Sequence, residues 1–539
     1  MVHAHNVYVT TNNGVVFGEH IPFARDVSPV VNATLDVFKG IPFAVPPIGQ
    51  MRFRKPLPIP DWSEPWNATY YRKQCWQLFL QNFTDPQDED CLYLNIWSPD
   101  VTGPPKPVMV WIHGGGFVLG TANIGPYDGT VLTSFYDIVY VSINYRLNGF
   151  GFLSTGDEEL PGNYGLWDQV LALKWIKENI AAFGGDPERI TIFGQSAGGA
   201  SVGFHLVQEE SWNYFHRAIM LSGTTMSPWA QETNPANARE DAFLLGRLAG
   251  CGVTTTSREL ADCLRQVDAY RLTVAITTNN IPLGPVVDGD FFQSDSRSLL
   301  NRGHFKKCNV LFSTTADDGT IITARAYPTE LLTRFPNSDF ETFTAKLGRF
   351  MYTYTNDLIV RSIQQQYVDW SKRDAENTNY FNDFVRVSTD EGFLCPAEYT
   401  ARVYAEANLP VYRALFNHLP KYSTWPDPFV KWRGIAHSED NPYTFGRGFN
   451  PERGHVFTLQ EEDLSLNMMQ YYTNFAKTGN PNIDLENNTV TSHWEPFTLT
   501  NQFVKDLQLD LGDLYGLRAS YCAVWNNLIP ELITQSGIY

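Results

Sequence analysis

The run Arg189-Ile-Thr-Ile-Phe193, followed directly by Gly194-Gln-Ser196-Ala-Gly198, indicates the fold most clearly. The first five residues are β-branched or apolar and typical of a short buried strand. The small residues that follow, to about Val207, favour a helix. A G-x-S-x-G pattern between strand and helix is typical of a serine on a sharp, strained turn, where Cβ atoms at the flanking glycines would not fit. A structural glycine turn is the alternative, but the strand before and the helix after favour Ser196 as a nucleophile.

Alternating strands and helices surround this turn. We expect strands at Val108–Ile112, Ile138–Ile143 and Asn309–Thr314, and a helix at Trp167–Phe183 whose apolar residues recur every three or four positions. Gly184 follows that helix, as a C-terminal glycine does. This alternation predicts an α/β fold with a large, mostly parallel central sheet flanked by helices.

A second glycine-rich segment, His113-Gly114-Gly115-Gly116-Phe117, follows the Val108–Ile112 strand. Three consecutive glycines let backbone amides approach a ligand that any Cβ would block. The pattern matches the loop that supplies oxyanion donors beside a serine nucleophile, together with the amide of Ala197 at the helix start. A flexible glycine turn is the other interpretation, and His113 itself fits a packing role better than that of a base.

The residues alone leave the base and the acid open. If the order along the chain is serine, acid, histidine, the base lies late in the sequence. His437, on the polar loop around Gly434–Asn441, is the best placed candidate. The other late histidines compete with it: His418, His455 and His493. Asp317 and Asp318 both follow the Asn309–Thr314 strand, where a carboxylate can orient a histidine.

Composition excludes several classes of protein. The net charge is −18 and the pI about 5.0, which disfavours nucleic acid and anionic membranes as partners. No window of 18 apolar residues is present, so we expect no stable membrane insertion. The stretch from Met1 to Gly14 lacks the charged and apolar regions of a signal peptide.

Many further stretches match one family in the same order. The chain resembles the type-B carboxylesterase and cholinesterase family of α/β-hydrolases along nearly its whole length. The matching stretches are Phe38–Phe43, Pro46–Phe53, Glu89–Trp97, His113–Phe117, Asn144–Leu147, Gly162–Gln169, Phe183–Pro187, Gly194–Ser201, Pro285–Gly289 and Asn474–Pro481. The resemblance implies one α/β-hydrolase domain over residues 1–539. The helical periodicity of the segments at roughly 225–305 and 325–410 predicts that they are cap-like insertions around the sheet.

The resemblance also implies roles for individual residues. It makes Ser196 the nucleophile, His437 the base, and Asp318 rather than Asp317 the acid, where most relatives have Glu. The oxyanion donors become the amides of Gly115, Gly116 and Ala197. Arg52 and Glu89 match the family's structural ion pair. No metal and no organic cofactor is implied.

The cysteines and the glycosylation sequons indicate a secreted or secretory-pathway protein. The implied disulfides are Cys75–Cys91 and Cys251–Cys263, which leave Cys308, Cys395 and Cys522, interpreted as buried and inert. Glycosylation sequons occur at Asn32, Asn67, Asn82 and Asn487. Both features are typical of secreted proteins.

Departures from the cholinesterase branch favour a general carboxylesterase. The segment Cys75–Cys91 is short and has no Trp directly before Glu89, where the cholinesterases have one; Trp76 lies at its other end. Gln195 replaces a Glu, which removes a charge favouring cationic substrates. The segment Thr320–Ile322, directly after Gly319, has no aromatic residue where the cholinesterases have them, and no Phe pair occurs around Asn279–Leu283. The sequence predicts a serine carboxylesterase acting on small esters, with cholinesterase, lipase and non-catalytic adhesion protein as the alternatives.

Overall fold

One mixed sheet organises the molecule, which the computed structural model describes over residues 6–26, 28–77, 86–123, 125–328, 336–353, 356–373, 375, 377–423, 432–450, 456–486 and 488–536. Thirteen strands of the described part join it, in the order β1-β2-β3-β7-β9-β8-β10-β11-β12-β13-β14-β15, with β4 beside β2. Their bounds are β1 Asn6–Thr11, β2 Gly14–Arg25, β3 Val31–Pro42, β4 Trp66–Asn67, β7 Tyr93–Ser98, β8 Lys106–Ile112, β9 Val139–Ile143, β10 Gly185–Gln195, β11 Arg217–Leu221, β12 Asn309–Thr315, β13 Val411–Phe416, β14 Phe503–Leu507 and β15 Gly512–Tyr515. β5 (Gln74–Cys75) and β6 (Gln87–Asp88) form a separate small ladder.

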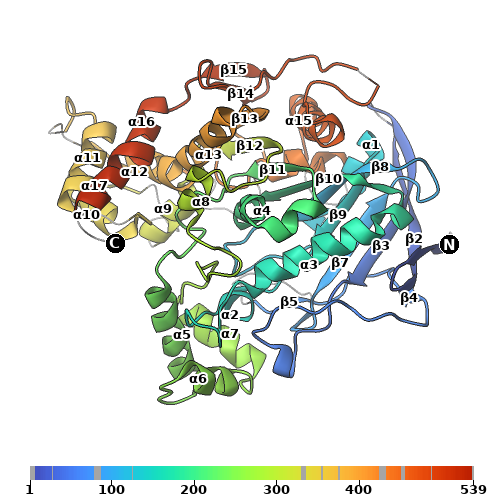
Figure 1. Ribbon diagram of the computed structural model, residues 1–539. Helices are drawn as coiled ribbons and strands as arrows, with labels where there is room; N and C mark the ends of the chain where they lie inside the picture. The colour runs from blue at the N-terminus through green and yellow to red at the C-terminus, as the bar shows by residue number, and fades with distance from the viewer. Residues whose placement is uncertain are drawn as a thin grey trace.

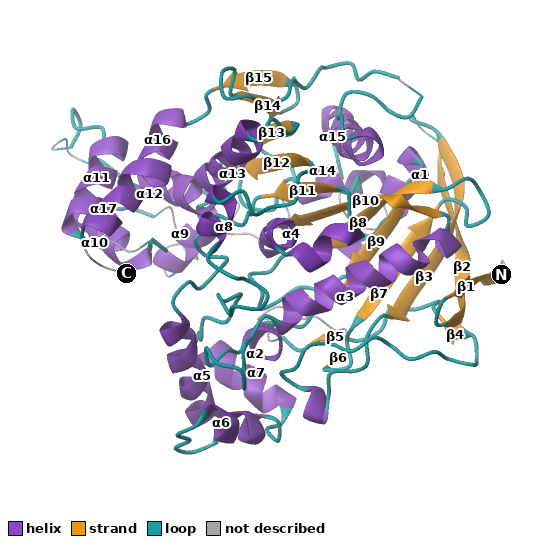
Figure 2. Ribbon diagram, viewed as in Figure 1, coloured by secondary structure: helices purple, strands orange, loops and turns teal. Residues whose placement is uncertain are grey.

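Helices cover both faces of this sheet (Figure 1). Their bounds are α1 Thr130–Tyr136, α2 Asn148–Phe152, α3 Tyr164–Asn179, α4 Ala197–Val207, α5 Pro235–Ala249, α6 Ser257–Leu264, α7 Ala269–Thr278, α8 Ser296–Asn301, α9 Thr320–Ala326, α10 Phe340–Phe350, α11 Asp357–Tyr367, α12 Phe381–Thr389, α13 Cys395–Glu406, α14 Asn441–Thr444, α15 Leu459–Thr478, α16 Ala519–Ala523 and α17 Ile529–Gln535. Figure 2 shows two helical groups beyond the sheet, α5–α7 below it and α10–α12 with α16 and α17 to its left. Among the described residues, no helix is both long and apolar enough to span a membrane.

The central strands are parallel and buried on both faces. Seven strands run parallel to one another, in the order β9, β8, β10, β11, β12, β13 and β14. Antiparallel pairs begin on either side of them, with β7 beside β9 and β15 beside β14. Alternate residues of β8 enter two different clusters, Val108 and Val110 on one face and Met109 and Trp111 on the other. Since successive side chains of a strand point to opposite faces, this strand needs apolar residues at every position.

Element bounds differ from the sequence expectation where local geometry intervenes. β10 begins at Gly185 rather than Arg189, because it pairs with Lys106 before a register shift at Ile190. The helix expected to reach Phe183 ends as α-helix at Asn179 and continues as a 3-10 turn, Ile180–Phe183. Gly184 then takes a left-handed conformation at φ 77°, as a C-terminal glycine does.

Three disulfides link the described chain. Cys75–Cys91 and Cys251–Cys263 are the pairs that the resemblance implies. The interpretation of Cys395 and Cys522 as inert thiols is wrong, because they form a third disulfide over 127 residues of sequence. It joins α13 to α16. Cys308 is a buried free thiol, and burial raises its pKa to about 12.

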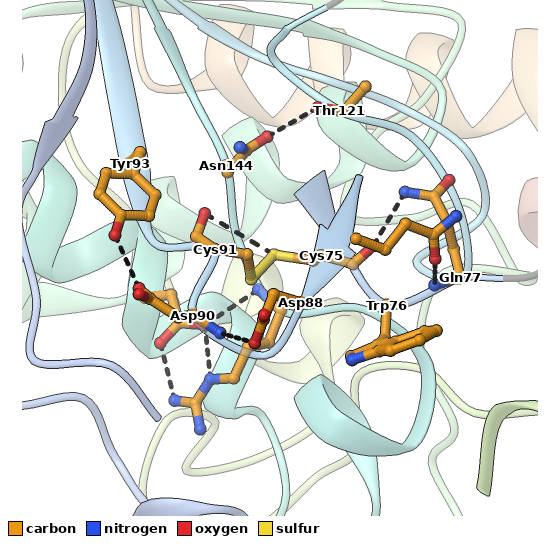
Figure 3. The surroundings of a disulfide bond; sticks show 12 residues. Cys75, Trp76, Gln77, Asp88, Asp90, Cys91, Tyr93, Thr121 and Asn144 are labelled. Atoms are coloured by element: carbon orange, nitrogen blue, oxygen red, sulfur yellow. Dashed lines mark hydrogen bonds and ion pairs between the residues drawn. A yellow bond between two sulfur atoms is a disulfide. The ribbon is translucent and has the colours of Figure 1, made fainter. Parts of the chain in front are cut away.

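Two arginine–carboxylate pairs support the loops below the sheet. Arg146 and Asp168 are buried and bonded through two nitrogens, at 2.8 and 2.7 Å. Arg52 bonds Glu89 through Nε at 2.7 Å and donates to two carbonyl oxygens between α6 and α7. Figure 3 shows the nearby Cys75–Cys91 disulfide, with Trp76 beside it. Such buried pairs fix loop positions, since removing one partner leaves an uncompensated charge.

Candidate active site

Ser196 occupies the strained turn that the motif predicts, between β10 and α4 (Figure 1). Its backbone has φ 59° and ψ −126°, a conformation that L residues rarely adopt. The flanking glycines are required by close packing: a Cβ on Gly198 would lie 2.0 Å from the carbonyl oxygen of Ile112. The amide of Ser196 donates to the carbonyl of Leu221 at 2.8 Å, which ties the turn to β11. The hydroxyl is therefore held at the carboxyl end of the parallel strands.

The glycine loop after β8 lies against this turn. A Cβ on Gly114 would lie 2.5 Å from the carbonyl oxygen of Gln195 and 3.0 Å from Cβ of Ser196. Gly115 and Gly116 have φ values of 112° and 61°, which favour glycine at both positions. The loop brings Gly114 against Ser196, Gly115 and Gly116 follow it in the same loop, and the amide of Ala197 lies at the N-terminus of α4.

His113 has a packing role, and its ring is neutral at pH 7. Its ring stacks on Tyr145 with centroids 4.4 Å apart, and Nδ1 contacts the carbonyl of Gly114 at 2.9 Å. Burial lowers its pKa to about 4. The side chain of His113 therefore supports the glycine loop through packing.

His437 and Asp318 meet in the interior. Nδ1 of His437 lies 2.7 Å from Oδ1 of Asp318, and the two residues are 2% and 0% exposed. The other carboxylate oxygen accepts from the hydroxyl of Ser222 and the amide of Thr315, both at 2.9 Å. Both oxygens of Asp318 are thus engaged. The carboxylate that faces the imidazole belongs to Asp318 and not to Asp317.

Asp317 instead holds the loop that carries His437. Its Oδ2 accepts from the amide of Ile435 at 2.9 Å, its own amide donates to the carbonyl of Ile435, and it forms a bridge with Ala436. Gly434 has φ 61°, and a Cβ there would lie 2.1 Å from Oδ2 of Asp317. This bridge brings the histidine loop against the strand end, which lets the short aspartate side chain reach the imidazole.

The competing histidines lie elsewhere. Nε2 of His418 contacts Oε1 of Glu461 at 3.0 Å, away from the turn at Ser196. His493 is exposed. His455 falls outside the described residues.

Gln195 contacts the imidazole directly, which sequence reasoning missed. Its Nε2 lies 3.0 Å from Nε2 of His437, and the residue is 2% exposed. The substitution of Gln for Glu was visible in the sequence, but it indicated only a lost charge. The hydrogen bond depends on the path of the histidine loop, which has no local sequence signal.

An aromatic wall adjoins the imidazole. Phe393, on the π-helical turn Asp390–Leu394, has its ring centroid 4.9 Å from that of His437. Trp229 lies 5.6 Å from Phe393 and donates to the carbonyl of Gly392 at 2.9 Å. The expectation from the segments after Gly319 and around Asn279–Leu283 named no aromatic residue here, because Phe393 comes from a distant part of the chain.

Two buried acids lie near this centre. Burial, with the negative charge of Asp318, raises the pKa of Asp440 to about 7. Burial likewise raises the pKa of Glu391 to about 7, although Oε1 accepts from the amide of Thr353 at 2.7 Å. Within the described ranges, no group of three or more His, Cys, Asp or Glu could hold a metal ion.

The predicted glycosylation sites lie partly in the described structure. Asn32 and Asn67 are exposed, on β3 and β4. Asn82 and Asn487 lie outside the described residues.

Comparison with known proteins gives the same family over the whole chain. The model of the carboxylesterase family matches residues 5–525. An acetylcholinesterase of Bungarus fasciatus is 36% identical over 98% of this chain and 87% of the relative. An acetylcholinesterase of Electrophorus electricus is 34% identical over 97% and 88%, and a cholinesterase of Mus musculus is 35% identical over 98% and 88%.

Proposed function

Because the chain belongs to the carboxylesterase family and has the α/β-hydrolase fold, we propose that it hydrolyses small carboxylic esters through an acyl-enzyme on Ser196. The observation that carries the proposal is the 2.7 Å contact between His437 and Asp318 beside the strained serine turn. A buried carboxylate at Nδ1 orients the imidazole and stabilises the imidazolium that forms when it takes the serine proton.

The proposed reaction has two steps. In the first, Oγ of Ser196 attacks the ester carbonyl carbon, its proton passes to Nε2 of His437, and that proton then goes to the departing alcohol. In the second, water attacks the acyl-enzyme, its proton passes to His437, and Ser196 leaves with that proton. The amides of Gly115, Gly116 and Ala197 would hold the oxyanion in both steps, because a preorganised donor favours the charge that develops in the transition state.

The residue beside the imidazole favours neutral esters. Gln195 adds no charge there, while the nearby rings of Phe393 and Trp229 can pack against neutral and cationic groups alike. A carboxylate at position 195 would favour a cationic alcohol group by charge. The substrate class we propose is therefore an ester with an uncharged alcohol group.

Choline ester hydrolysis is the second candidate, because the relatives named above are cholinesterases and the chain carries a net charge of −18. The two candidates separate in one comparison of kcat/KM, for acetylthiocholine and for its uncharged isostere 3,3-dimethylbutyl thioacetate. We expect the uncharged ester to be hydrolysed at least as well. A preference of 10-fold or more for acetylthiocholine would assign the chain to the second candidate.

Hydrolysis itself is tested on p-nitrophenyl butyrate with the Ser196→Ala variant. Activity should disappear while the far-UV circular dichroism and thermal midpoint stay close to those of the parent. Retained turnover in the variant would refute the proposed nucleophile. Three disulfides, which form in oxidising compartments, support a secretory-pathway location for this activity.

A further inference from the structure

The imidazole of His437 has a buried polar partner at each ring nitrogen. Nδ1 lies 2.7 Å from Oδ1 of Asp318, and Nε2 lies 3.0 Å from Nε2 of Gln195. A carboxamide nitrogen carries two hydrogens and cannot accept, so Gln195 donates and Nε2 of His437 accepts. The proton of the neutral ring is therefore on Nδ1, where it is donated to Asp318.

A second glutamine–histidine pair in the same chain has the opposite arrangement. Oε1 of Gln169 lies 2.9 Å from Nε2 of His205, while its amide nitrogen donates to Ser201 at 3.1 Å. Ser211 lies 2.9 Å from Nδ1 of His205, so that nitrogen accepts and Nε2 donates. The two pairs select opposite tautomers of histidine. Only the tautomer at His437 leaves a lone pair on Nε2.

We infer that Gln195 is a positioning residue for the proposed reaction: its amide holds His437 in the neutral tautomer that can act as base, and disfavours the imidazolium. The inference rests on the proposed function and deepens it. When the Oγ–H bond of Ser196 breaks and the proton binds Nε2, that nitrogen becomes a donor. It can then no longer accept from Gln195.

The hydrogen bond from Gln195 therefore has to break at each proton transfer, because the lone pair that accepts it is the one that takes the serine proton. Rotation about the last side-chain bond of Gln195 would present Oε1 to the new N–H of the imidazolium. A glutamate at position 195 could only accept, and would stabilise the imidazolium at all times.

The charged groups around His437 set the background for this effect. Asp318 faces Nδ1, and burial together with the charge of Asp318 raises the pKa of Asp440, on the same loop as His437, to about 7. The π-helical turn that carries Phe393 also holds Asp390, which is paired with Arg518, and Glu391, which accepts from Thr353. None of these groups changes when Gln195 is replaced.

The test is the pH profile of kcat/KM on a p-nitrophenyl ester. Gln195→Glu should move the midpoint of the acid limb up by roughly one pH unit, because a carboxylate replaces a donor beside the imidazole. Gln195→Met should move it up by about half a unit, since it removes one hydrogen bond to the neutral ring. Gln169→Met, which alters the other buried pair, is the matched control and should leave the midpoint unchanged. If both Gln195 variants lower activity equally at every pH with the midpoint fixed, Gln195 has only a structural role and the inference is wrong.

A second readout does not depend on hydrolysis. In the Ser196→Ala background, the low-field proton resonance of Nδ1–H of His437 reports protonation of the ring in the resting protein. Its titration midpoint should rise when Gln195→Glu is added, by an amount similar to the shift in the kinetic profile. A shift in this resonance in a chain that hydrolyses no ester would reject the proposed function and keep the inference. If the chain hydrolyses esters but the titration midpoint of this resonance does not move, the inference is rejected and the proposed function is kept.

Discussion

Ser222 donates its hydroxyl to Oδ2 of Asp318 over 2.9 Å, on the oxygen that His437 does not use. Together with the amide of Thr315, it holds the carboxylate in one orientation inside the fold. The 2.7 Å contact with the imidazole is therefore built by three elements, the ends of β11 and β12 and the loop before α14. Substitutions at Asp318 and Ser222 can therefore separate the effect of the carboxylate's charge from the effect of its orientation.

Replacing Asp318 by Asn should lower kcat by about 10⁴-fold at neutral pH, because an amide favours the wrong tautomer of the histidine. The matched variant Asp317→Asn keeps an oxygen for the amide of Ile435 and should lose less than about 10-fold. Steady-state kinetics on a p-nitrophenyl ester measure both. Equal losses in the two variants would contradict the assignment of the acid.

Ser222→Ala should lower kcat by about 5- to 10-fold, as expected for one lost hydrogen bond of about 1 kcal/mol to the orienting carboxylate. KM should change little, since Ser222 contacts Asp318 rather than the proposed substrate position. Full activity in Ser222→Ala would show that the carboxylate is oriented without the hydroxyl.

The disulfide between Cys395 and Cys522 should contribute strongly to stability. It closes 127 residues, for which the chain-entropy model gives about 4 to 5 kcal/mol. The double variant Cys395→Ser with Cys522→Ser should lower the urea midpoint of unfolding clearly. Cys308→Ser, at the buried free thiol, is the control and should have a much smaller effect. Similar losses in both would mean that the cross-link itself contributes little.

Asp440 should make the free energy of unfolding fall as pH rises from about 4 to about 7. Burial raises its pKa in the folded protein to about 7, above the value of 3.8 for a free aspartate, so folding takes up a proton between these pH values. The free energy of unfolding contributed by this group is present below pH 4 and falls by up to about 1.4 kcal/mol per pH unit as pH rises toward 7.

The variant Asp440→Asn removes that proton uptake. Its stability relative to the parent should therefore increase as pH rises from 4 to 7 and level off above 7. Urea unfolding at pH 4.5, 5.5, 6.5 and 7.5 measures the difference. A difference that is constant over this range would show that Asp440 does not change its protonation on folding.

Sequence patterns predict the parts of the site that depend on local sterics. The serine turn and the glycine loop follow from where a Cβ cannot fit, and both neighbourhoods match the expectation at Gly198 and Gly114. The face pattern of β8 also follows from its apolar residues. These features need only a few consecutive residues to be specified.

Contacts between segments far apart in the sequence cannot be predicted from a few consecutive residues. His437 could not be separated from His418 by chemistry alone, because its partner Asp318 lies 119 residues away in sequence. The pairing of Cys395 with Cys522 and the hydrogen bond from Gln195 to His437 depend in the same way on how the sheet brings loops together. Phe393 reaches the imidazole from a π-helical turn, which apolar periodicity does not predict.

The central claim is that Ser196 is the activated nucleophile, and covalent labelling tests it most directly. A fluorophosphonate should modify the protein once per chain, with the adduct on the peptide that contains Ser196 by mass spectrometry, and Ser196→Ala should not be labelled. An unlabelled parent protein, or an adduct on another residue with Ser196 intact, would contradict the account.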